Sequence, residues 1–459
     1  MFKVSSYISL ITRFPFVVLC VFLWAWTQMM SILMEPELNL NFLIDTSLII
    51  YLDVFSRTFS LGILLFLVLT MIHEAYLSYM NKSWIDSFGV LVLLLYVISN
   101  FMLDSLTSSA LLVRQDYIFL MISLVMCFCV IPFFKLSMRS FWKFNNIIFI
   151  KLIKVFVYMS IVAGLISTGL FLFDYFLGVF VSLWVYKTVF LLCYGCFGSL
   201  YFLSQVPVNL SQFEADTPLP KFYYLVSRIY LVPLVYISTS LFYAYIGLEF
   251  LNGYSIEEYL VPFFLIFLIL NIFLMLQLGL FDDKVHSNFS TRLYLKYSYF
   301  FNLPIVLYFF YWTTKFWFQQ GITEFWYLIW VFILSYIIIS IYFIFSSQKD
   351  IRVIPLAFLL GAVMLSFSPI KPFYVAVNSQ YHHLIEFMQT HNLISETSTF
   401  DFSNSSELTD LQKYKLKTYL YFLDTHSSLH LLQPHYGYPI SVDSINLTRV
   451  FYDFDILDN

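Results

Sequence analysis

The sequence predicts an all-α polytopic membrane protein, with about 11 transmembrane helices followed by a small, mainly helical extracytoplasmic tail. The first observation is composition: 60% of the 459 residues are hydrophobic and 11% are charged, whereas a soluble domain carries about 25% charged residues. No soluble fold of this length hides so much apolar surface, so lipid must solvate most of the chain. The second observation is that apolar stretches recur up to residue 369, after which the chain turns polar.

A spanning helix needs about 20 mostly apolar residues, and we assign eleven such segments. The first follows Lys3 and Arg13, and no small-residue cleavage site comes after it, so we expect an uncleaved span and not a signal peptide. The last is short and is bracketed by Pro355 and Pro369; a proline in the first turn is tolerated. The eleven lie near residues 14–34, 58–79, 84–103, 116–134, 147–172, 175–204, 221–247, 259–281, 294–318, 323–346 and 351–368.

Lysine and arginine in the short loops set the orientation. With a cytoplasmic N-terminus and alternating spans, one side of the membrane collects far more basic residues than the other. The cytoplasmic side collects Lys3, Arg13, Lys82, Lys135, Arg139, Lys143, Lys151, Lys154, Lys221, Arg228, Lys284, Arg292, Lys296, Lys349 and Arg352; the opposite side collects Arg57, Arg114, Lys315 and Lys371. One missed span would mix the later loops, so this bias favours eleven spans and an outer tail.

A proline-rich linker divides the membrane region. Pro207, Pro218 and Pro220 make this cytoplasmic stretch stiff and non-helical. The expected units are an N-terminal six-span half, the linker, a C-terminal five-span half and the extracytoplasmic tail, at residues 1–206, 207–220, 221–369 and 370–459.

The tail contains two predicted amphipathic helices. The first places apolar residues on one face, with Asn378 or Ser379 as its N-cap; the face is Val377, Tyr381, Leu384, Ile385 and Met388. The second opens with a capping box of Thr409 and Gln412, and its apolar face is Leu416, Leu420 and Leu423. After Pro434 the chain looks extended or irregular.

Several stretches resemble a bacterial inner-membrane family known as domain of unknown function 4153. They are "TRFPF" before the first span, "LGILLFLVLTMIHEAY" in the second, "PKFYYLVSRIYLVPLVYISTSLFYAYI", and "RVIPLAFLLGAVMLSFSPIKPFYVAVNSQYHHL". The resemblance covers roughly residues 12 to 440, best from 218 to 390. It implies a bacterial multi-pass membrane protein with a polar tail, and it transfers no catalytic residue.

Three polar residues inside predicted spans are candidate sites. Lys187 lies about twelve residues into its span, near mid-bilayer, where a lysine marks an ion pair, a proton or anion site, or a side chain that snorkels to the interface. His73 and Glu74 lie near the inner end of the second span. They either relay protons or cap the bundle at headgroup level.

Two acidic residues in the first outer loop support a rival interpretation. Polytopic lipid-linked glycosyltransferases carry an acidic residue there as a base or metal ligand, and also end in an outer soluble domain. Glu35 and Glu37 therefore allow a membrane enzyme acting on a lipid-linked substrate at the outer face. Acidic side chains are also ordinary at headgroup level.

The remaining polar and thiol groups fit structural roles. Cys193 and Cys196 have redox spacing, but in mid-helix they read as apolar fillers beside a small-residue seam of Gly195 and Ser199. His426 and His430 lie four residues apart, a spacing that can hold a metal on a helix, but no carboxylate or cysteine accompanies them at fixed spacing. We expect no disulfide, no metal and no cofactor.

The sequence therefore favours a non-enzymatic protein of the bacterial inner membrane, either an envelope-associated scaffold or a transporter-like bundle, with no catalytic residue assigned. Its expected partners are the lipid bilayer and, through the tail, envelope proteins. The net charge of −4 gives no footprint for nucleic acid.

Overall fold

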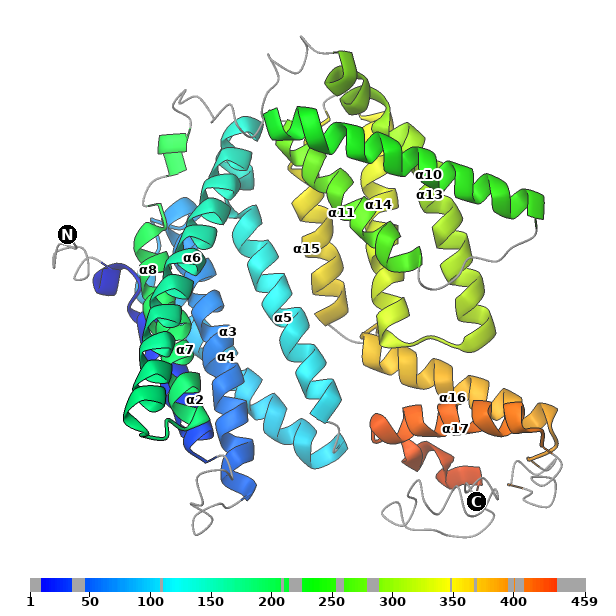
Figure 1. The fold of residues 1–459 in the computed structure, drawn as a ribbon, viewed down its shortest axis with the longest axis horizontal. Helices are drawn as coiled ribbons and strands as arrows, with labels where there is room; N and C mark the ends of the chain where they lie inside the picture. Colours follow the sequence, from blue (N-terminus) through cyan, green and yellow to red (C-terminus); the bar gives the residue numbers. More distant parts are fainter. Residues whose placement is uncertain are drawn as a thin grey trace.

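The computed structural model describes most of the chain, and nearly all of the described residues are helical. They are residues 10–34, 46–107, 110–207, 210–213, 225–252, 260–278, 289–346, 349–366, 370–394, 400 and 408–435. Figure 1 shows two groups of long helices side by side, with the shorter helices α16 and α17 lying across one end of the C-terminal group.

The N-terminal group contains six long helical segments. The last of them is one continuous helix in three parts, with the π-helical turn η3 between α7 and α8. The elements are α2 (Pro15–Leu33), α3 (Thr46–Tyr76), α4 (Lys82–Thr107), α5 (Ala110–Val130) with η2 (Ile131–Phe134), α6 (Met138–Leu177), and α7 (Leu183–Phe190), η3 (Leu191–Gly198) and α8 (Ser199–Gln205).

The described part of the C-terminal group contains five long helical segments, and the tail follows it. Figure 1 shows α10 running steeply across its neighbours instead of along them. The elements are η5 (Ser227–Leu231) with α10 (Val232–Asn252), α11 (Leu260–Leu278), α13 (Phe289–Gln320), α14 (Glu324–Phe345) and α15 (Val353–Ser366), then α16 (Pro372–Thr390), α17 (Asp410–Thr425) and η7 (Leu429–His435).

Among the described residues, nine helices are long and apolar enough to cross a membrane, so the chain is a multi-pass membrane protein. Two further predicted spans correspond to α13 and α15. Many Tyr, Trp and Thr residues lower the mean hydropathy of α13, and α15 has 14 residues, which rise only about 21 Å. The total of eleven spans therefore stays a prediction.

Helix α6 is longer than the bilayer requires. Its 40 residues correspond to about 60 Å, twice the hydrocarbon core. Ser137 caps its first turn by accepting a hydrogen bond from the Ser140 amide, and Gly178 ends it with a φ of 59°. Glycine adopts that left-handed conformation without strain. The helix was expected from residue 147 and begins nine residues earlier.

Aromatic packing fills the core of the C-terminal half. The rings of Phe264 and Phe309 stack with centroids 3.9 Å apart, and those of Tyr299 and Phe343 stack at 4.4 Å. A hydrogen-bonded group lies among these rings. Asn302 Nδ2 donates to Asn271 Oδ1 at 2.7 Å, and the Tyr294 hydroxyl donates to the same oxygen at 3.0 Å. This buried group fixes the register of α11 against α13.

The tail helices α16 and α17 pack on each other through a shared apolar cluster that includes Leu384, Met388, Leu416 and Leu420. The predicted capping box at the start of α17 is confirmed, with both of its hydrogen bonds present.

The predicted N-cap of α16 is wrong. The helix begins at Pro372, whose fixed φ suits the first helical position, so Asn378 and Ser379 lie inside it. Ser379 Oγ instead accepts a hydrogen bond from the Ile322 amide at 3.0 Å. This bond joins α16 to the turn between α13 and α14.

Candidate functional site

The two helical halves meet where α5 packs against α15. We call this contact the seam. Phe119 and Leu365 are buried in it with neighbours from α14, and the hydroxyls of Ser123 and Ser366 lie 3.1 Å apart. Polar contacts close the seam at both of its ends.

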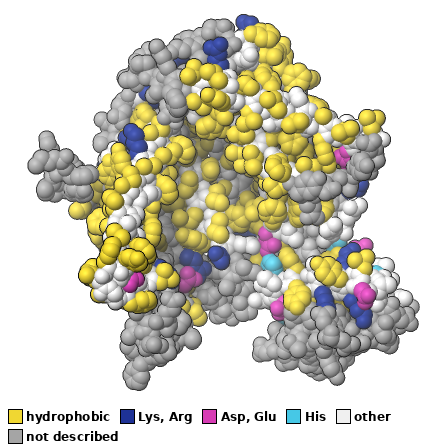
Figure 2. Space-filling view, in the orientation of Figure 1, with side chains coloured by type: hydrophobic (Ala, Val, Ile, Leu, Met, Phe, Trp, Pro, Cys, Tyr) yellow, Lys and Arg dark blue, Asp and Glu magenta, His cyan; other side chains and the backbone are white. Residues whose placement is uncertain are grey.

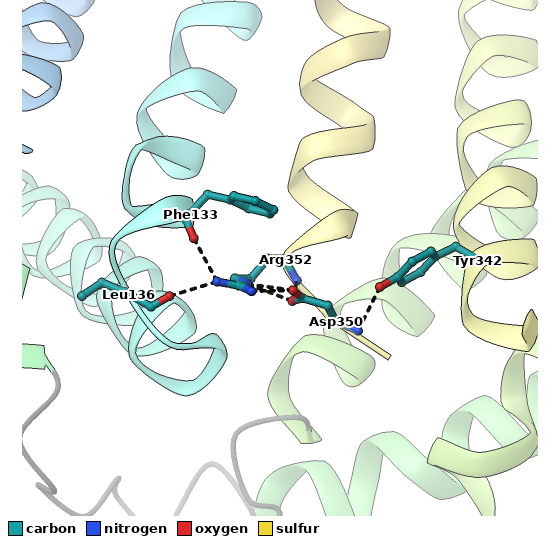
Figure 3. Close-up of polar contacts among 5 residues, drawn as sticks. All are labelled: Phe133, Leu136, Tyr342, Asp350 and Arg352. Atoms are coloured by element: carbon teal, nitrogen blue, oxygen red, sulfur yellow. Dashed lines mark hydrogen bonds and ion pairs between the residues drawn. The ribbon is translucent and has the colours of Figure 1, made fainter. Parts of the chain in front are cut away.

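The first end of the seam is closed by Arg352, just before α15 (Figure 3). Its guanidinium binds both carboxylate oxygens of Asp350, with Nη2 at 2.6 Å from Oδ2. Its Nη1 donates to the carbonyls of Phe133 and Leu136, at 2.9 and 3.0 Å. Both carbonyls belong to the connection between α5 and α6. We call this group the Arg352 tie.

Electrostatics fix the charge state of this group. Burial alone would raise the pKa of Asp350, but the hydrogen bonds and charge of Arg352 outweigh it, so the pKa of the carboxyl lies below its usual range. The guanidinium also lies over the Phe133 ring, 4.9 Å from its centroid. Both partners therefore stay ionised and tightly placed at neutral pH.

The opposite end of the seam is closed by Lys371, which follows α15. Its Nζ lies 2.7 Å from Asp116 Oδ2 on α5. The two side chains are only 17% and 16% exposed, so solvent screens this pair less than a surface pair. We call this pair the Lys371 tie.

Beside the Lys371 tie, the tail contacts the C-terminal half through His426. Its Nε2 donates to the Glu324 carboxylate at the start of α14, and its Nδ1 donates to the Phe422 carbonyl at 2.7 Å. Gln115 of α5 also donates to Glu324, at 3.2 Å. Both partners of the His426 ring are oxygen atoms that accept hydrogen bonds, so the imidazolium form, with a proton on each ring nitrogen, satisfies both contacts.

The pKa of His426 agrees with this geometry. Burial alone would lower the pKa, but the hydrogen bonds to Glu324 and Phe422 and the carboxylate charge more than offset it, so the pKa is raised above its ordinary value of 6.5.

The face shown in Figure 2 is hollowed between the two halves. Hydrophobic side chains cover the walls of the hollow, and basic, acidic and histidine side chains gather at its edge towards α16 and α17. The arrangement is an apolar recess with a charged margin. At the outer end of the seam, Asp116 and Glu324 hold cationic partners, so these contacts join elements of the fold.

The structure places Glu74 in a second ion-paired group, at the end of α3. Arg13 Nη2 lies 2.7 Å from Glu74 Oε2, and the same guanidinium donates to the Val206 and Pro207 carbonyls after α8. His73 lies beside it and contacts the Met80 carbonyl at 3.1 Å. Arg13 thus links Glu74 of α3 to the chain that follows α8, and the relay and capping roles of His73 and Glu74 stay predictions.

Lys187 lies closer to a helix end than the sequence suggested. The predicted span from residue 175 is wrong at its start, because α6 continues to Leu177 and α7 begins at Leu183. Lys187 is therefore in the second turn of α7, about 6 Å along the axis. This position suits a long side chain that reaches the interface, and a transport role stays a prediction. Glu35 and Glu37 lie outside the described residues.

The thiol and histidine candidates separate in space. All five cysteines are free, and Cys193 and Cys196 lie buried in η3. His430 Nδ1 contacts the Ser427 carbonyl, whereas His426 binds Glu324, so the two rings serve different partners. Among the described residues, no three His, Cys, Asp or Glu side chains converge as a metal site would require.

Sequence reasoning missed the Arg352 tie, the Lys371 tie and the His426 contact. Arg352 and Lys371 were counted as loop charges and His426 as a metal candidate, whereas their acidic partners received no role. The available signal was a charged residue directly at a span end. Arg352, Asp116 and Glu324 all share that feature. No family model, no curated protein and no solved structure matches this chain.

Proposed function

We propose that this protein is a static, envelope-associated scaffold of the bacterial inner membrane, with eleven spans, a cytoplasmic N-terminus and the tail outside. The observation that carries the proposal is the seam with polar ties at both ends. Membership of the 4153 family is part of the proposal and rests on the sequence resemblance alone.

The ties argue against a transport cycle. Alternating access needs one part of the bundle to rock against the other, opening one end at a time. Here the Arg352 tie and the Lys371 tie are closed together, and Gln115 of α5 adds a bond to Glu324 of α14. Opening the Lys371 end would separate a partly buried charge pair, which is unfavourable. Opening the Arg352 end would leave Asp350 bound to Arg352 but would break the bonds from Arg352 to the Phe133 and Leu136 carbonyls.

The orientation is supported by charge. The Arg352 tie and Arg13 lie at the end of the bundle that the loop charges assign to the cytoplasm, and the tail lies at the other end (Figure 1). A tail outside the membrane, held to both halves, is placed to receive an envelope protein.

A disulfide across the seam tests the static scaffold. The buried hydroxyls of Ser123 and Ser366 lie 3.1 Å apart, so a Ser123→Cys/Ser366→Cys variant should close in high yield under mild oxidation. Hydrogen exchange of the oxidised and reduced forms should then agree at both ends of the bundle. Ser123→Cys alone is the control. A locked form with exchange changed at one end only would identify a moving transporter instead.

The second candidate is an enzyme acting on a lipid-linked substrate at the outer face. The hollow of Figure 2, with its charged margin under the tail, favours it. Such an enzyme needs a free carboxylate, while Glu324 and Asp116 are ion-paired in the structure. Binding of a polyprenyl phosphate that is lost in Glu324→Gln and kept in the matched variant Glu386→Gln would favour the enzyme.

A further inference from the structure

A second recess lies away from the seam, between α3, α6 and α8. Its volume is about 510 Å³, and apolar side chains form almost all of its wall. They include Ile63, Leu67, Leu152, Phe156, Met159 and Phe202. We call this recess the α6 groove.

The α6 groove runs along the helices. Along the continuous helix formed by η3 and α8, the groove extends from Tyr194 to Leu203, which is about 13 Å of helix axis. The end of the groove that faces the proposed cytoplasmic side is Leu203, two residues before α8 ends at Gln205. The groove thus begins at the end of the spanning region and reaches towards the bilayer centre, the course that a lipid acyl chain follows.

Positive charge lies at the end of the groove near Leu203. Lys151 is one residue before the lining residue Leu152, and its Nζ donates to the Gln205 carbonyl at 2.6 Å. An ammonium group has three donors, of which this bond uses one. Lys154 lies one turn further along α6 and is exposed.

Among the described residues, the helices that line this end supply no carboxylate to balance the two lysines. From Met138 onwards the first acidic residue of α6 is Asp174, at its far end, and α8 contains none. Glu74, near the end of α3, is paired with Arg13. Two like charges three residues apart on a helix repel, and an anion from the membrane surface would relieve that repulsion.

We propose that the α6 groove binds one acyl chain of an anionic phospholipid of the cytoplasmic leaflet, with the phosphate held by Lys151 and Lys154. Basic pockets between membrane helices on the cytoplasmic side suit such headgroups. This inference adds a bound lipid to the proposed scaffold. It rests on the proposed function only in assigning the lipid to the cytoplasmic leaflet, which follows from the proposed orientation.

Native mass spectrometry of the full-length protein in detergent tests the proposal. Phosphatidylglycerol and phosphatidylcholine with identical acyl chains are the probes. The wild type should retain phosphatidylglycerol preferentially, and Lys151→Gln/Lys154→Gln should lower that preference by about fivefold for each lysine removed. Lys154→Gln alone tests an exposed position where folding is not at risk. Lys296→Gln, at an exposed lysine on α13, is the matched control and should keep the preference.

A second variant separates the chain from the headgroup. Ser199 lines the groove, so Ser199→Phe should fill it and weaken binding of both lipids. Equal retention of both lipids by the wild type would mean ordinary boundary lipid only and would overturn the proposal. A preference that survives in both lysine variants would also overturn it. Neither result bears on the seam, so failure here is distinct from failure of the scaffold.

Discussion

At the residue scale, single charged side chains connect parts of the chain that are distant in sequence. His426 reaches across 102 positions to Glu324, and Lys371 reaches across 255 positions to Asp116. Each lies at the end of a span or in the tail, where water and lipid meet. A charge placed there is paired more easily than one in the hydrocarbon core.

The His426 contact makes tail docking dependent on pH. The pKa of His426 is raised in the folded protein, so its stabilisation is complete below the ordinary value of 6.5 and is lost as pH rises through the raised pKa. The protection factors of the α17 amides, which are corrected for the intrinsic pH dependence of exchange, should therefore fall over a pH series that starts below 6.5 and continues into the alkaline range.

Two variants check the origin of this pH effect. His426→Gln should abolish it, and His430→Gln, at an exposed histidine that bonds only a nearby carbonyl, should leave it intact. An unchanged pH profile in His426→Gln would show that another group controls docking.

At the element scale, the three-part helix of α7, η3 and α8 departs most from a regular helix. The π-helical turn occupies Leu191–Gly198, where an added residue per turn changes which side chains face α2. Gly195 lies in this turn against Trp24. A Cβ at Gly195 would lie 2.3 Å from Trp24 Cζ3, so the close approach of α2 requires glycine.

Replacing Gly195 should therefore destabilise the N-terminal half. Gly195→Ala forces the Trp24 ring to move, and overpacking of this kind costs about 1–3 kcal/mol. The measurement is thermal unfolding of the purified protein in detergent. Gly164→Ala is the control, since nothing lies within 4 Å of its added Cβ, and it should be neutral. Gly195→Ala combined with Trp24→Leu should recover the thermal stability, because the smaller side chain leaves room for the added methyl group. If stability is not recovered, the clash with Trp24 is not the cause of the loss.

At the scale of the whole molecule, two helical halves joined at one seam carry a tail at one end. The seam buries apolar residues along its length and charges at its ends. Apolar contact supplies little net attraction between helices in lipid. The polar ties therefore help to fix the position of the two halves relative to each other.

The proposed topology predicts opposite labelling at the two ends of the molecule. Leu411 on α17 and Phe134 in η2 are 78% and 84% exposed. In intact spheroplasts, a membrane-impermeant maleimide should label Leu411→Cys, and should label Phe134→Cys only after the membrane is opened. The chain without an added cysteine is the control, because its native thiols lie in helices and are buried or half-buried. The reverse pattern would invert the orientation.

The sequence by itself determined that the chain forms a series of membrane helices and how α17 begins. Apolar length and the Thr409–Gln412 capping box depend on neighbours within a few residues, so they can be read locally. Charge counting also gave an orientation, which the labelling experiment can check. The start of the span that carries Lys187 was misplaced, because a continuous apolar sequence does not mark where α6 ends.

Only the tertiary structure decided which charges meet. Glu74 pairs with Arg13 from before α2, and the ring of His426 faces Glu324 of α14. The physical reason is that a side chain at a helix end can reach any of several neighbouring elements. Helix packing, which depends on shape across the whole bundle, selects one of them.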